Sequence, residues 1–88
     1  EQKRREAELR QQSAPLRKKI AQFEIEMEKL ATRLSQIEQQ LVDGELYDSQ
    51  NKEKLTALLN EQVQLKKNLE IVETDWLVTQ EELEVLIA

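Results

Sequence analysis

The sequence predicts an all-α protein, an antiparallel two-helix coiled-coil hairpin with a tip loop around residues 43–50 and a distortion near Pro15. Apolar residues recur at alternating gaps of three and four in two long runs, which is the heptad pattern of helices that bury one narrow stripe. A short non-periodic break separates the runs. Charged residues make up 35% of the chain, with one Gly and one Pro, so little interrupts the helices.

The first predicted helix covers residues 3–42. Its seam is formed by eight apolar residues, namely Leu16, Ile20, Phe23, Met27, Leu30, Leu34, Ile37 and Leu41. Leu9 lies seven residues before Leu16 and keeps the same phase. Pro15 cannot donate a backbone hydrogen bond, so either Ser13 caps a new helix or one long helix is distorted there. Because Leu9 keeps the phase, we expect helix on both sides of Pro15.

The predicted tip begins at Asp43 and Gly44, where we expect Gly44 to end the first helix in the left-handed backbone region. Leu46 and Tyr47 follow, and the heptad pattern does not explain either residue. Two interpretations remain open. The tip folds back so that it covers Leu41, or Leu46 and Tyr47 form an exposed surface that binds a partner.

The second predicted helix covers residues 51–87. Its seam residues are Leu55, Leu58, Gln62, Leu65, Leu69, Val72, Trp76, Thr79, Leu83 and Leu86. Trp76 is the only tryptophan and lies on this seam, so we favour a packing role over a base-stacking or ligand site. Two such seams joined by a short break predict that the chain packs against itself.

Charges flanking the seams predict the register between the two helices. The preferred register places Phe23 opposite Leu69 and Leu16 opposite Trp76. Slipping one helix by a heptad brings mostly like charges together, which disfavours that alternative. The preferred register predicts five ion pairs across the flanks, namely Arg17–Glu73, Glu24–Lys66, Glu38–Lys52, Lys19–Asp75 and Arg33–Glu61.

Composition excludes several functional classes. The chain has no His and no Cys, which removes histidine-dependent catalysis, the usual zinc ligands and disulfides, and the sequence suggests no catalytic, cofactor or metal site. No apolar run has the length of a membrane span, so we expect no membrane partner. The 88 residues predict a single domain, and its charged, helix-prone start suggests a fragment of a larger protein.

Two sets of residues are candidates for binding. The net charge of −5 opposes a general attraction to nucleic acid, but basic residues on outward positions could contact phosphates. These candidate nucleic-acid contacts are Lys3, Arg4, Lys18, Lys29 and Lys67. The candidate docking residues are the tip residues Leu46 and Tyr47, and an outward apolar row repeated every seven positions at Ile71, Val78 and Val85.

The chain also resembles the C-terminal coiled-coil domain of ABC-F ATPases, first in the YheS-like branch and second in the Uup-like branch. The resemblance lies in the Leu- and Glu-rich stretch at 15–41, the tip DGELYD at 43–48, and the stretch at 69–86 with its single Trp76. Gly44 stands where the family often has a tip proline. The resemblance implies a cytoplasmic appendage of an ATPase that acts on ribosomes in translation. ATP and Mg²⁺ would bind parent domains that this fragment lacks, so the fragment itself would not be an enzyme.

Two functions therefore remain open. The hairpin assists binding of an ABC-F ATPase to ribosomal RNA or other nucleic acid, or it is a structural spacer or protein-docking arm that contacts the upstream ATPase domains or another protein. In either case we expect the isolated hairpin to be monomeric.

Overall fold

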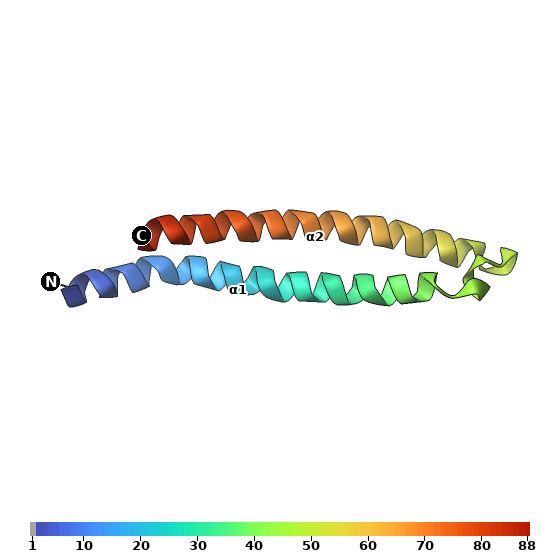
Figure 1. The fold of residues 1–88 in the computed structure, drawn as a ribbon, viewed down its shortest axis with the longest axis horizontal. Helices are drawn as coiled ribbons and strands as arrows, with labels where there is room; N and C mark the ends of the chain where they lie inside the picture. Colours follow the sequence, from blue (N-terminus) through green and yellow to red (C-terminus); the bar gives the residue numbers. More distant parts are fainter. Residues whose placement is uncertain (1) are drawn as a thin grey trace.

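The computed structural model describes residues 2–88 and contains two long antiparallel helices joined by a short tip (Figure 1). Helix α1 spans Gln2–Leu41 and helix α2 spans Lys52–Ile87. The predicted bounds were 3–42 and 51–87, so each end agrees to within one residue. Two short 3₁₀ helices form the tip, η1 at Gly44–Tyr47 and η2 at Ser49–Asn51. The molecule is a rod of 72 × 15 × 14 Å, and the first turns of α1 extend beyond the end of α2. The predicted all-α hairpin is confirmed.

The core is the line of side chains where the two helices meet. Ile20 and Ile37 of α1 and Leu58 and Val72 of α2 are buried, and the remaining seam positions from Leu16 to Leu86 are buried or half-buried. Because each helix has only one neighbour, a side chain is covered only when it points at the seam. The alternating three–four spacing therefore identifies the core correctly.

Pro15 lies inside α1 without ending it. Its ring removes the hydrogen bond to the carbonyl of Gln11, but helix continues on both sides, as expected from the phase of Leu9. Leu9 itself is 36% exposed, because the seam is thin at the open end of the hairpin. Figure 1 shows the axis of α1 changing direction gently near its first turns.

The tip folds back onto the seam through Leu46. This side chain is only 5% exposed and joins Ile37 and Leu58 in the main buried cluster, with Leu41 packed against it. Of the two interpretations of the tip, the one in which it covers Leu41 is therefore correct. Leu46 is not available at the surface as a docking residue.

Gly44 does not have the expected left-handed conformation, since no glycine among residues 2–88 has a positive φ. The chain instead turns through the 3₁₀ helices. The Asp43 carboxylate accepts a hydrogen bond from the Glu45 backbone N–H at 3.1 Å, and Asn51 Nδ2 donates to the Glu45 carbonyl at 2.9 Å. These side-chain bonds turn the chain without a residue in the left-handed region.

The contacts across the seam fit the register slipped by one heptad, so the preferred register is wrong. Leu65 packs against the buried cluster of Ile37 and Leu58, and Trp76 contacts Glu24 rather than lying opposite Leu16. The slip also explains why the first turns of α1 extend beyond the end of α2 (Figure 1).

The predicted pair of Arg33 and Glu61 nevertheless forms across the seam, because the Arg33 side chain extends along α1 towards Gln36. Arg33 Nε lies 2.7 Å from Glu61 Oε1, and Arg33 Nη2 donates to Glu61 Oε2 at 2.9 Å. This two-pronged arrangement fixes geometry as well as charge.

The other predicted ion pairs were wrong. Within residues 2–88 no ion pair forms between Arg17 and Glu73, Glu24 and Lys66, Glu38 and Lys52, or Lys19 and Asp75. Arg17 instead donates to the hydroxyl of Ser13, one helical turn earlier. Long exposed side chains gain too little from such pairs to offset their lost rotational freedom.

Trp76 has the expected packing position. It is half-buried on the seam, and its indole Nε1 donates to Glu24 Oε1 at 3.2 Å on the opposite helix. Ser13 and Thr79 are also buried on the seam, and their hydroxyls donate to carbonyls of their own helices, at 3.3 and 2.7 Å. The seam therefore buries two hydroxyl groups without leaving them unpaired.

Candidate functional site

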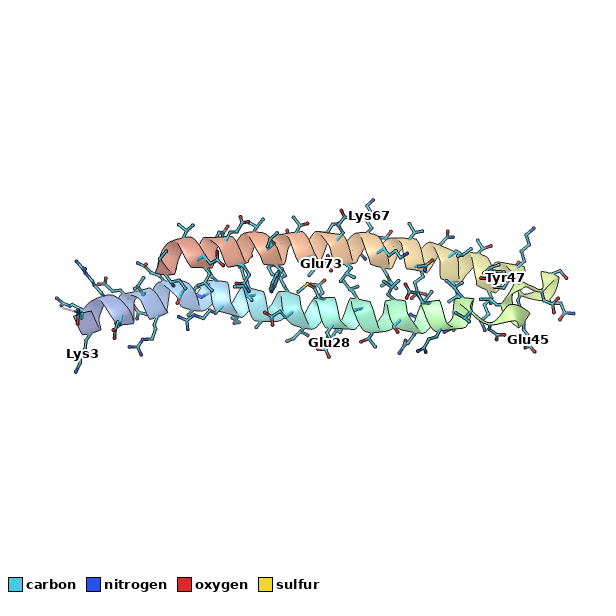
Figure 2. All side chains as sticks on the ribbon, in the orientation of Figure 1. Lys3, Glu28, Glu45, Tyr47, Lys67 and Glu73 are labelled. Carbon is cyan, nitrogen blue, oxygen red and sulfur yellow. The ribbon has the colours of Figure 1, made fainter. Side chains whose placement is uncertain are left out.

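The candidate nucleic-acid contacts are all exposed. Lys3, Arg4, Lys18 and Lys29 lie on α1, and Lys67 lies on α2. Figure 2 shows Lys3 and Lys67 pointing away from the rod in opposite directions. The heptad phase puts Arg4, Lys18 and Lys29 on the outward face of α1. The five residues therefore do not form one patch, and only Arg4, Lys18 and Lys29 share one side of α1.

The first half of α1 is more basic at its surface than the sequence suggested. Residues 2–19 contain seven Lys or Arg and two Glu, and none of these basic residues forms an ion pair within the part of the chain that the structure describes. The expected pairing of Arg17 and Lys19 with acids of α2 had removed them from consideration. Arg5, Arg10 and Lys19 are exposed as well. Sequence reasoning left all three out of the candidate contacts, and Lys19 was left out because an ion pair with Asp75 was expected.

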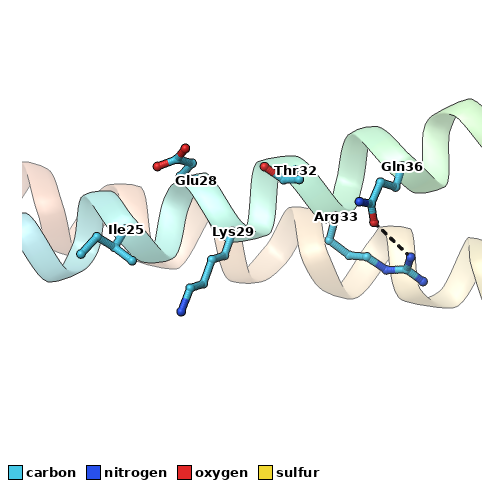
Figure 3. A pocket seen from close by; sticks show the side chains of 6 residues that line it. All are labelled: Ile25, Glu28, Lys29, Thr32, Arg33 and Gln36. Atoms are coloured by element: carbon cyan, nitrogen blue, oxygen red, sulfur yellow. Dashed lines mark hydrogen bonds between the residues drawn. The ribbon is translucent and has the colours of Figure 1, made fainter.

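A shallow hollow lies on the surface of α1 around Lys29 (Figure 3). Its lining includes Ile25, Glu28, Thr32 and Gln36 as well as Lys29 and Arg33. Arg33 is held by Glu61 and also donates to Gln36 Oε1 at 3.4 Å. Lys29 is therefore the cation of this hollow that is available to a partner, with the carboxylate of Glu28 beside it.

The Arg33–Glu61 pair alters the pKa of both its members. The hydrogen bond from Arg33 lowers the pKa of the Glu61 carboxyl below its ordinary value of 4.5, and the same bond raises the pKa of Arg33. Both side chains are about 40% exposed. The pair lies on the exposed flank of the seam, where it joins the two helices.

The outward docking candidates on α2 form what we call the α2 ridge, defined as Ile71, Val78 and Val85. Their exposed fractions are 52%, 48% and 80%. Carboxylates border the ridge: Glu70 and Asp75 line a hollow with Ile71, and Glu81 and Glu82 line one with Val78 and Val85. Leu77, which sequence reasoning missed, is also exposed, at 54%, directly beside Val78. Its position next to the predicted row was the signal that could have identified it.

The tip offers one exposed candidate. Tyr47 is 60% exposed, and its hydroxyl donates to the carbonyl of Leu41 at 2.8 Å. This bond satisfies a carbonyl at the end of α1. The ring therefore has a structural role, while one of its faces remains accessible.

Neither a metal site nor a membrane span is present in the described part of the chain. Among residues 2–88 no group of acidic side chains is arranged to hold a metal ion. No helix within the same residues combines the length and the apolar composition needed to cross a membrane.

Comparison with known proteins gives one consistent result. No family model and no solved structure matches the chain. Over 87 residues, 99% of its length, the chain is 54% identical to "Probable ATP-binding protein YheS" of Escherichia coli strain K12. It is 63% identical over 45 residues, 51% of its length, to the protein of the same name from Haemophilus influenzae. The matched segments make up 14% and 7% of these relatives.

Proposed function

We propose that the chain is a non-enzymatic module of a larger parent protein, and that it helps this parent bind the ribosome or a nucleic acid. The proposal starts from the match to a C-terminal segment of an ABC-F ATP-binding protein. The parent would be a cytoplasmic ATPase that acts in translation. It would bind ATP and Mg²⁺ in domains outside this chain, which spans only 14% of the E. coli relatives. The hairpin would extend from those domains as a rod.

The observation that carries this proposal is the basic first half of α1. Its seven Lys and Arg residues form no ion pair within residues 2–88, so their charge is available to phosphates. Phosphate contacts by Lys and Arg supply most of non-specific nucleic-acid affinity through the release of counterions. The straight outward face that includes Arg4, Lys18 and Lys29 suits a nucleic-acid backbone better than a pocket ligand.

The test is a titration of the hairpin with RNA and DNA at several salt concentrations. Binding should weaken as salt rises, and each lost phosphate contact should reduce the slope of log K against log salt by roughly 0.7 to 0.9. Lys18→Gln and Lys29→Gln should each lower the slope. Lys54→Gln, which changes an exposed lysine near the tip, is the matched control and should leave the slope unchanged.

Two results would reject this proposal. The first is an absence of binding at low salt. The second is a slope that Lys18→Gln and Lys29→Gln change no more than Lys54→Gln does, because the charge would then act without regard to position.

A second function, a protein-docking arm, is favoured by the α2 ridge. Three outward apolar side chains repeated at heptad spacing are unusual on a solvent-facing helix, whereas single exposed apolar residues are common. Such an arm would contact the upstream ATPase domains or another protein. Asp substitution of Val78 should abolish that contact and leave nucleic-acid binding intact, which separates the two functions.

A further inference from the structure

The α2 ridge lies in the most acidic part of the molecule. From Asn68 to Ala88 the sequence contains six carboxylates and no Lys or Arg, and none of the six forms an ion pair within residues 2–88. The six are Glu70, Glu73, Asp75, Glu81, Glu82 and Glu84. Ridge and carboxylates share the same stretch of helix, so any occupant of the ridge meets both at once.

Charge decides which occupants the ridge can accept. A second copy pairing through the same ridge would bring one set of carboxylates against another. Nucleic acid and anionic lipid would meet the same repulsion, because they too are negative. The occupant must therefore be apolar along its centre and positively charged along its edges.

We propose that the α2 ridge binds a basic amphipathic helix of a partner protein. Such a helix would lay an apolar stripe along Ile71, Val78 and Val85 and place Lys or Arg beside Asp75, Glu81 and Glu82. The three ridge residues span 14 positions, or about 21 Å of helix, which corresponds to roughly two heptads of contact. The inference deepens the docking function and is independent of the nucleic-acid contacts on α1.

The experiment uses a synthetic helical peptide of about three heptads, with Leu along one stripe and Lys on both flanks. Its affinity for the hairpin is measured by fluorescence anisotropy of the labelled peptide. The Lys-flanked peptide should bind, and binding should weaken as salt screens the charges. A peptide with the same Leu stripe and Glu flanks should not bind, and neither should one with Lys flanks and Ala in place of Leu.

Variants of the hairpin locate the contact. Val78→Asp should weaken binding of the Lys-flanked peptide at least about tenfold, because it brings a carboxylate into an apolar contact. The matched control is Ile25→Asp on α1, where the exposed fraction is 55% against 48% at Val78, and it should leave the affinity unchanged. The double variant Glu81→Lys and Glu82→Lys should weaken the Lys-flanked peptide and allow the Glu-flanked peptide to bind.

Three outcomes would overturn the proposal. They are equal binding of the two flank types, an equal effect of Val78→Asp and Ile25→Asp, and a dimer in sedimentation that Val78→Asp dissociates. The two proposals fail independently, because they concern different helices. Lys18→Gln tests nucleic-acid binding on α1 and should leave binding of the peptide to α2 unchanged.

Discussion

Replacing Leu46 with Ala tests whether the tip is part of the core. Leu46 is 5% exposed and packs against Ile37 and Leu58, so truncation removes three carbons from a buried cluster. At about 0.8 kcal/mol per buried methylene the transfer term is about 2.4 kcal/mol, and the cavity left behind adds to it. The tip lies at the end of the rod and can partly collapse into the space. We therefore expect the free energy of unfolding to fall by about 2 to 3 kcal/mol.

The assay is urea unfolding followed by far-ultraviolet circular dichroism. Val42→Ala is the matched control, because Val42 is close in sequence and apolar but 84% exposed, and its truncation should change the free energy of unfolding by less than about 0.5 kcal/mol. If the two variants lose equal stability, Leu46 does not pack in the seam and the argument from burial fails.

Three further predictions concern the tip, the register and the tryptophan. Gly44→Ala should raise the free energy of unfolding by about 0.4 to 1 kcal/mol in urea titrations, since φ is not positive there and a Cβ meets nothing within 4 Å; a loss of stability would show that the turn needs glycine. Arg33→Glu should lower the unfolding temperature and the exchanged pair Arg33→Glu with Glu61→Arg should restore it. Because Arg33 lowers the pKa of Glu61, the stabilisation from this pair is complete above the ordinary Glu pKa of 4.5. It is lost as the pH falls through the lower pKa of Glu61 in the folded protein. Glu61→Gln should therefore remove this part of the dependence of stability on acid pH. Trp76→Phe keeps a ring on the seam but removes the donor to Glu24, and should cost about 0.5 to 1.5 kcal/mol by thermal unfolding, whereas no change would mean that water replaces the bond.

The sequence was sufficient to predict the helices and the seam, but it did not give the correct register. Ile20, Ile37, Leu58 and Val72 were all on the predicted stripe, and all are buried. A two-helix rod offers only one place to bury a side chain, so heptad period and burial must coincide. The Arg33–Glu61 pair was predicted from the wrong register, and it forms because the long Arg33 side chain extends towards Gln36 and reaches Glu61.

The remaining details depend on short-range geometry that the pattern does not encode. Leu46 and Val42 are similar in sequence terms, but the 3₁₀ turns send Leu46 inward and leave Val42 outside. Gly44 fits a left-handed stop as well as a 3₁₀ start, and the side-chain bond from Asp43 favours the second. The basic surface of α1 was underestimated because the acidic residues expected to pair with it do not lie opposite it in the observed register.

The seam is a single row of layers, and each layer contacts only the layers next to it. In such a one-dimensional assembly, a matched segment can be removed from both arms without disturbing the rest. Deleting one heptad from each arm at facing positions would rejoin the seam in phase and shorten the rod by about 10 Å. Reach is thus a property that insertion or loss of paired heptads can set independently of the tip and of the surfaces at the open end.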